Sequence, residues 1–208
     1  MALRLLPFRQ YDEQDVVNLY ALESTLALAD TTVDDAGSNG VFVSISTGNF
    51  NAETITYGND SYLGKSNYPF VGADMYPSND ALTIKAATDG ALPLGVTLNQ
   101  TAKADENGEK LLYNTTKKEE LQAVLPGQSV PVATKGIFTL ADSAFDGAAS
   151  AYPVGTGIVI SSSTDGKVTA GAPTAATAFG TVLGTGSRAS QGGLTDQFAG
   201  DYIVVKIG

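Results

Sequence analysis

The sequence predicts an all-β protein built from two tandem small β-barrel or β-sandwich-like units, with a short linking helix and an extended N-terminal arm. Composition is the first observation behind this fold class. The 208 residues include 23 glycines and are 43% hydrophobic but only 16% charged. Such a mixture favours short strands joined by many turns over long helices. An internal repeat is the second observation, and it predicts that there are two units.

Three segments of the first half recur in the same order in the second half. A repeat in fixed order is typical of a duplicated unit, and chance similarity among small residues is the alternative. The matches are Leu28-Ala29-Asp30 with Leu140-Ala141-Asp142, residues 40–47 with 157–164, and residues 95–98 with 180–183. Duplication predicts that residues 41–46 superimpose on 158–163, and 95–98 on 180–183. The expected organisation is an N-terminal arm (1–14), a first β unit (15–101) with an insertion (58–79), a linker with a short helix (102–127) and a second β unit (128–208).

Alternating apolar and polar residues predict the strands. The clearest strand is 41–46, where Val41, Val43 and Ile45 fall on one face. Residues 15–28 fit a helix face and a strand equally well, and the extended character of the matching segment 130–140 favours a strand. The dipeptides Asp89-Gly90 and Asp165-Gly166 predict turns. Further strands are expected at 54–57, 81–85, 94–98, 129–134, 136–140, 157–161, 167–169, 179–183 and 202–207.

One helix is expected, at residues 117–125. Thr116 and Glu119 have the spacing of a capping box. Leu121, Val124 and Leu125 then fall on one helical face, and Pro126-Gly127 ends the pattern. We expect this helix to link the two units and to rest its apolar face on a β surface.

The first ten residues have the character of an arm. They are rich in apolar residues and carry two arginines and no acid, while Pro7 discourages a helix. A strand or clasp on its own domain is one interpretation, and an arm that is mobile alone and docks on a partner is the other. The candidate contact residues of the arm are Leu3, Arg4, Leu5, Leu6, Phe8 and Arg9.

The insertion at residues 58–79 has no counterpart in the second half. Its four aromatic residues favour an ordered segment, because disordered segments are poor in aromatics. They either pack the loop down or form a contact patch. These residues are Tyr62, Tyr68, Phe70 and Tyr76.

Charge and hydropathy indicate which partners to expect. The net charge is −10, and an acidic surface repels phosphate backbones, so we expect no nucleic-acid partner. Residues 12–64 contain no base and nine acids: Asp12, Glu13, Asp15, Glu23, Asp30, Asp34, Asp35, Glu53 and Asp60. No apolar run approaches the roughly 18 residues of a membrane span, and residues 1–8 are too short for the apolar core of a signal peptide. We expect a soluble protein without a membrane partner.

Catalysis and metal binding are not expected. Cysteine and histidine are absent, which removes disulfides, thiolate ligands and the usual acid–base and nucleophile pairs. The carboxylate pairs Asp34-Asp35 and Asp105-Glu106 lie in polar, turn-like stretches. Residues 105–109 offer oxygen ligands, but they lack the spacing of a calcium-binding EF-hand and fit a turn around Asn107-Gly108. The sequence therefore predicts no enzyme, no cofactor and no metal.

The second half resembles the capsid decoration, or cement, proteins of tailed bacteriophages. Four segments carry this resemblance, and the opening residues 1–9 are also similar to the openings of phage structural proteins. The segments are Lys135-Gly136-Ile137-Phe138, Tyr152-Pro153-Val154-Gly155 before an apolar strand, the turn Gly166-Lys167, and the strands at 179–184 and 202–207. The chain departs from the family by carrying two units and an aromatic insertion.

The resemblance implies a structural role in a virion. Members of this family are small β-barrel-like modules, often trimeric, that bind outside the capsid shell, with an N-terminal segment on the major capsid protein. It implies a homo-oligomer, with a trimer favoured, made in the host cytoplasm and placed on the capsid surface of the virion. The arm residues, from Leu3 to Arg9, would be the capsid contacts. The alternative is a tail- or fibre-associated adhesion module that binds a receptor or glycan through the aromatic insertion.

Overall fold

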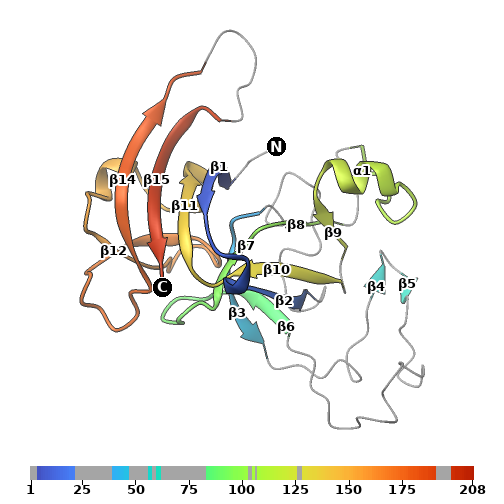
Figure 1. The fold of residues 1–208 in the computed structure, drawn as a ribbon, viewed down its shortest axis with the longest axis horizontal. Coiled ribbons are helices and arrows are strands. Elements are labelled where there is room, and N and C mark those ends of the chain that lie inside the picture. Colours follow the sequence, from blue (N-terminus) through green and yellow to red (C-terminus); the bar gives the residue numbers. More distant parts are fainter. Residues whose placement is uncertain are drawn as a thin grey trace.

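The computed structural model describes residues 4–21, 39–46, 56–57, 60–61, 83–102, 105, 107–125, 128–190 and 198–208. Over these residues the protein consists of β-strands, mostly in antiparallel sheets, with one short α-helix and three 3-10 turns (Figure 1). The expected all-β class is confirmed.

Two sheets make up most of the described structure. A closed barrel has the order β10-β2-β6-β3-β7, and a six-stranded sheet has the order β1-β11-β15-β14-β12-β13. The barrel strands are β2 (Val16–Ala21), β3 (Phe42–Ser46), β6 (Thr83–Ala86), β7 (Gly95–Thr97) and β10 (Ser129–Ala133). The sheet strands are β1 (Leu5–Gln10), β11 (Gly136–Ala141), β12 (Gly157–Ile160), β13 (Val168–Gly171), β14 (Gly180–Arg188) and β15 (Gly200–Ile207).

Smaller elements lie between these strands. Their bounds are β4 (Thr56–Tyr57), β5 (Asp60–Ser61), β8 (Gln100–Thr101), β9 (Ala123–Val124), α1 (Thr115–Glu120), η1 (Glu13–Asp15), η2 (Asp142–Ala144) and η3 (Ala149–Ala151). The strands expected in the second half are all present, and those expected at 41–46, 81–85 and 94–98 are present as β3, β6 and β7. The expected insertion at 58–79 lies outside the described residues apart from β5.

The five strands of the barrel have the same order as five strands of the six-stranded sheet, all but β1. Read in chain order, β2, β3, β6, β7 and β10 correspond to β11, β12, β13, β14 and β15, and the neighbours β6-β3-β7-β10-β2 correspond to β13-β12-β14-β15-β11. Every corresponding pair of neighbours along this order is antiparallel in both sheets. The two units therefore share a topology. Duplication of the sequence itself stays a prediction.

The ladder registers set the correspondence residue by residue. Val43 lies opposite Gly95, as Ile158 lies opposite Gly180. Gly95 therefore corresponds to Gly180, as the repeat predicts, but the β3 match is displaced by two residues, because Ile158 corresponds to Val43 rather than Val41. On the first strand, Leu140 corresponds to Leu19. The expected match of Leu140-Ala141-Asp142 with Leu28-Ala29-Asp30 is wrong in register, and residues 28–30 lie outside the described residues.

Close strand approach explains why both sheets have glycine at this position. A Cβ on Gly95 would collide with the main-chain oxygen of Ala133 on β10, and a Cβ on Gly180 would collide with that of Lys206 on β15. Ala133 and Lys206 occupy corresponding places in the two registers. The same steric requirement thus recurs at the same point of both units.

The two units close differently. In the barrel, β2 closes the cylinder by pairing with β6 in parallel. In the second unit, β1 occupies the free edge of β11, so the sheet stays open along β1. After η2 the chain makes one parallel bridge, between Phe145 and Val168, and Val168 corresponds to Ile84 of the barrel's closing pair.

The N-terminal residues are a strand of their own domain, so the expected mobile arm is wrong. β1 pairs with β11 in the six-stranded sheet, and the Leu5 and Leu6 side chains are only 3% and 6% exposed. The amide of Leu5 donates a hydrogen bond to the Asn39 side chain, 3.3 Å away. The N-terminal residues form a strand because the edge of β11 offers main-chain hydrogen-bonding partners, and because Leu5 and Leu6 can be buried there.

The expected unit boundaries also need correction. β10 follows the linker but completes the barrel, between β2 and β7, because Val130 and Val132 fill the barrel interior. The segment 102–127 is therefore an excursion between two barrel strands and does not join two separate units. It has a small cluster of its own: Ala102, Leu111, Ala123 and Leu125, with Leu112 and Leu121 packed against it.

The helix is shorter than expected and begins with another cap. Asn114 is the N-cap, and its side chain accepts a hydrogen bond from the amide of Lys117, in place of the expected capping box at Thr116. The helix ends at Glu120, because Gln122 adopts a left-handed conformation with φ of 50°. Val124 then lies on β9, pairing with β8, so residues 121–125 present no continuous helical face.

The two units are interlocked. Gly166, in the β12–β13 turn, accepts a hydrogen bond from the Phe42 amide and donates one to the Ala87 carbonyl. Its φ is 74°, and a Cβ there would collide with Val41. The Phe42 and Phe179 rings lie 5.2 Å apart across the same contact. The larger apolar cluster accordingly takes residues from both units.

Candidate functional site

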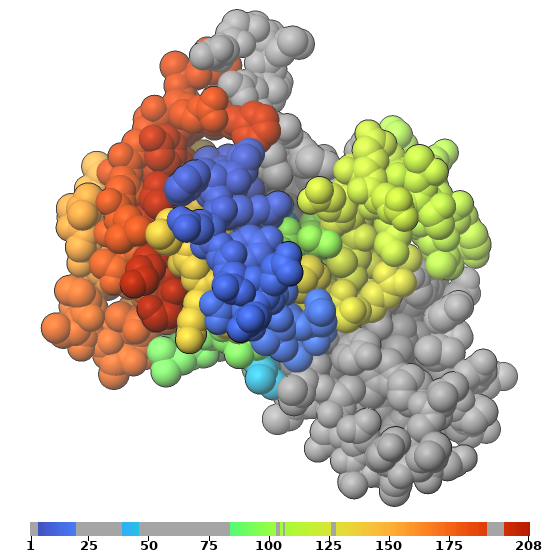
Figure 2. Space-filling view, viewed as in Figure 1, coloured from blue at the N-terminus to red at the C-terminus, as the bar shows by residue number. Residues whose placement is uncertain are grey.

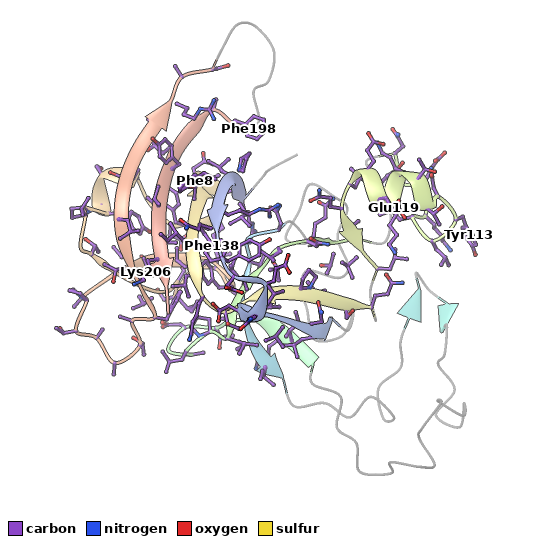
Figure 3. All side chains as sticks on the ribbon, in the orientation of Figure 1. Phe8, Tyr113, Glu119, Phe138, Phe198 and Lys206 are labelled. Atoms are coloured by element: carbon purple, nitrogen blue, oxygen red, sulfur yellow. The ribbon has the colours of Figure 1, made fainter. Side chains whose placement is uncertain are left out.

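The expected contact residues of the N-terminal segment fall into two groups. Arg4, Leu5 and Leu6 are buried in their own domain, and Leu3 lies outside the described residues. Phe8 is 62% exposed, and Arg9 is exposed beside it. Only Phe8 and Arg9 therefore remain available to a partner without unfolding β1. Figure 3 labels Phe8 on β1 and Phe138 on the neighbouring strand β11 of the same sheet.

β1 is the edge strand of the six-stranded sheet. Its register on β11 shifts between Leu5 and Arg9, so Pro7 and Phe8 lie in an irregular stretch. Proline on an edge strand removes a donor where no ladder bond is needed. Asn39 covers the edge at Leu5, whereas the surface at residues 7–10 is exposed. In Figure 2 the N-terminal residues, in blue, lie on the surface of the molecule next to the orange and red strands.

The expected aromatic patch belongs to the insertion at residues 58–79. Tyr62, Tyr68, Phe70 and Tyr76 lie outside the described residues. Tyr113 is the most exposed aromatic residue in the part of the chain that the structure describes, at 80%. It lies at the outer end of the α1 region, far from Phe8 (Figure 3).

Two adjoining hollows form a surface that the sequence did not indicate. One, of about 610 Å³, is lined by Lys118, Glu119, Gln122, Gln128, Ser129 and Asn99 among others. The other, of about 380 Å³, is lined by Arg9, Tyr11, Glu13, Asn18, Pro131 and again Asn99. We call the two together the Asn99 groove. The residues of its walls are far apart in sequence, and no sequence pattern predicts a left-handed backbone at Gln122. Only the folded structure could therefore reveal the groove.

A serine and an aspartate meet in the second unit, but their geometry is that of a turn. The Ser161 hydroxyl, in a residue that is 1% exposed, donates to the Asp146 carboxylate. The same oxygen accepts hydrogen bonds from the amides of Ser163 and Thr164, at 3.0 and 3.3 Å. A nucleophile needs an accessible lone pair, and these bonds occupy those of Ser161 in a buried place. The pair holds the β12–β13 turn.

Tyr152 is the buried titratable group of this region. Its side chain is fully buried, and its hydroxyl donates to the carbonyl of Asp146 at 2.6 Å. Burial, with a further contribution from the Asp146 charge, raises the pKa of Tyr152 above its ordinary value, and hydrogen bonds partly oppose this. The Phe145 ring meets the Tyr152 ring edge-on at 5.1 Å. These contacts give Tyr152 a structural role in the core.

The Asp105 carboxylate closes a turn over residues 105–109. One oxygen of buried Asp105 accepts hydrogen bonds from the amides of Asn107 and Glu109, at 2.9 and 2.8 Å. The Asp105 carbonyl accepts another from Gly108, which has a φ of 82°. Among the described residues, no group of three or more acidic, histidine or cysteine side chains could hold a metal ion. In the same part of the chain, no helix has the length and apolar character needed to cross a membrane.

Comparison of the chain with models of protein families, with curated proteins and with solved structures finds no match.

Proposed function

We propose that this chain is a structural protein of a bacteriophage virion. It binds the outside of the assembled capsid, through the major capsid protein, and stabilises the shell. The chain acts there as a homo-oligomer, with a trimer favoured. The proposal rests on the sequence resemblance of the second half to capsid decoration proteins and on one structural observation, the exposed end of β1.

The exposed end of β1 carries the proposal. Phe8 adds a large apolar side chain, 62% exposed, next to the exposed cation of Arg9, on a chain with a net charge of −10. An aromatic side chain beside an arginine is the composition that interface hot spots favour. The edge position also supports the proposal, because an extended segment of a partner can add to a sheet at such an edge.

The rest of the described surface suits a binding role. The reactive groups that come together, Ser161 with Asp146 and Asp105 with its turn, are occupied by internal hydrogen bonds. A decoration protein needs contact area rather than chemistry. A ligand that binds only the assembled shell stabilises that shell by mass action. The acidic surface would keep a densely covered particle soluble.

Cosedimentation with capsids of the phage that encodes the chain tests the proposal. The Phe8→Ser variant should lose at least about tenfold in affinity for expanded capsids, since burial of a phenylalanine contributes roughly 1.5–3 kcal/mol. Leu92→Ser is the matched control, because Leu92 is 61% exposed but lies in the β6–β7 loop. Wild-type protein that does not sediment with capsids would refute the proposal, and equal losses in both variants would remove β1 as the contact.

A further inference from the structure

The Asn99 groove has features of a binding site that the proposed function does not use. Asn99 lines both hollows, at the point where the chain leaves β7 and turns towards β8. It is half-buried, and neither its side chain nor its main chain makes a hydrogen bond within the part of the chain that the structure describes. A half-buried amide of this kind retains its full capacity for a ligand.

The edge of β10 opens into the same groove. Leu98 donates to the Pro131 carbonyl at 3.0 Å, which is the last bond that joins this edge of β10 to the chain leaving β7. Main-chain groups of an antiparallel strand alternate between its two edges. The amide and carbonyl of Ser129 therefore point to the same edge as Pro131, beyond the end of β7, and Ser129 lines the larger hollow. Ser129 has no hydrogen bond on this edge among the described residues.

Gln122 supplies an independent observation. Its φ of 50° makes it the non-glycine residue with a left-handed backbone among the described residues. Glycine is the favoured residue at this position after a helix, because a side chain strains the backbone there. Strained residues of this kind concentrate at ligand-binding sites. Gln122 is exposed and lines the larger hollow, so the side chain that causes the strain is placed where a ligand would meet it.

The chemistry of the walls indicates the ligand class. Amides that both donate and accept line the groove, and each end has one cation and one carboxylate: Arg9 with Glu13, and Lys118 with Glu119. In Figure 2 the blue N-terminal residues and the yellow-green α1 region stand apart, with green and yellow residues between them. A sugar ligand would favour an open aromatic face. Tyr11, the aromatic residue in the lining, is instead stacked on Phe138 at 5.9 Å.

We propose that the Asn99 groove binds an extended polypeptide segment, whose main chain pairs with the open edge at Ser129 and with the amides of Asn99 and Gln122. Main-chain pairing at an open strand edge gives affinity for an extended peptide with little demand on its sequence. The mixed charges at both ends select a segment that carries charges of both signs. Phe8 does not line either hollow, but Arg9 lines the smaller one, so the proposed capsid contact and the peptide site meet at Arg9.

A displayed library of random dodecapeptides, applied to the full chain, tests this site. The strongest peptide should bind with a measurable Kd by calorimetry, and Asn99→Ala should weaken that binding by about tenfold or more. Gln122→Gly should also weaken it while raising the melting temperature, because it removes both the side chain and the strain. Tyr113→Ser is the control, since Tyr113 is 80% exposed and lies outside the groove lining.

Two further measurements distinguish main-chain pairing with a peptide from recognition of peptide side chains or of sugars. N-methylation of alternate residues in the selected peptide should abolish binding for one of the two alternations, because that series removes the amides that face Ser129. Binding that Asn99→Ala leaves unchanged would overturn the proposal, as would a library from which no peptide is enriched. Glycan-array binding that Asn99→Ala removes, without any peptide binding, would assign the groove to sugars and overturn it too.

Discussion

Individual glycines determine how closely the strands of each unit approach. Gly95 and Gly180 occupy corresponding places, and each faces the main-chain oxygen of the strand beside it. A methyl group there would meet backbone rather than a movable side chain, so a whole strand would have to shift. Gly184 is on β14 as well, but a Cβ there would meet open space. The two kinds of glycine permit a matched test.

Gly95→Ala should therefore destabilise the protein. We expect a loss of about 1–3 kcal/mol or more in the free energy of unfolding, the usual cost of overpacking, measured by urea denaturation. Gly184→Ala should stay within about 0.5 kcal/mol of the wild type, or stabilise it by limiting the unfolded chain. Equal effects of the two substitutions would show that β7 and β10 do not approach each other this closely.

Tyr152 makes the free energy of unfolding depend on pH in the alkaline range. Because burial raises its pKa in the folded state, the unfolded state loses this proton first as the pH rises. The contribution of Tyr152 is fully present below its ordinary pKa of 10.0 and is lost as the pH rises through the folded-state value. The free energy of unfolding should thus fall above about pH 10, and less steeply in Tyr152→Phe. Identical slopes in the two proteins would contradict this assignment.

At the scale of elements, the N-terminal residues form a structural strand, β1, and not the free arm expected from the sequence. Deleting residues 1–10 should lower the free energy of unfolding by at least about 3 kcal/mol, because Leu5 and Leu6 each bury an apolar side chain worth roughly 1.5–3 kcal/mol. Hydrogen exchange should then show loss of protection along β11, the neighbour of β1. A melting temperature unchanged by the deletion would show instead that residues 1–10 are a mobile arm.

The elements also show what sequence can predict. Strand alternation located β3 and the strands from β10 to β15, since period-two burial is a local property. The pairing of β1 with β11, and of β10 with β2, depends on contacts between distant residues and had no local signal. The helix was predicted too long because Leu121, Val124 and Leu125 fit a helical period, whereas the backbone turns left-handed at Gln122. The Asn99 groove was missed because its walls come from segments that are far apart in sequence.

At the scale of the molecule, two units share one topology. They are held together by an N-terminal strand that joins the sheet of the second unit and by a shared apolar core. β1 precedes the barrel in sequence but belongs to the other sheet, and Gly166 of that sheet bonds to barrel residues. Hydrogen bonds and a shared apolar cluster therefore connect the two units directly. An exposed apolar side chain at the sheet edge and a net charge of −10 would suit the proposed role of reinforcing a larger assembly.

The most direct test of the proposed capsid role is electron cryomicroscopy of the particle that contains the chain. We expect density for the two units on the outer face of the icosahedral shell, with Phe8 and Arg9 against the major capsid protein. The shell should also melt at a higher temperature with the chain bound than without it. Density confined to the tail or fibres, or shells whose melting temperature is unchanged at full occupancy, would contradict a stabilising capsid protein.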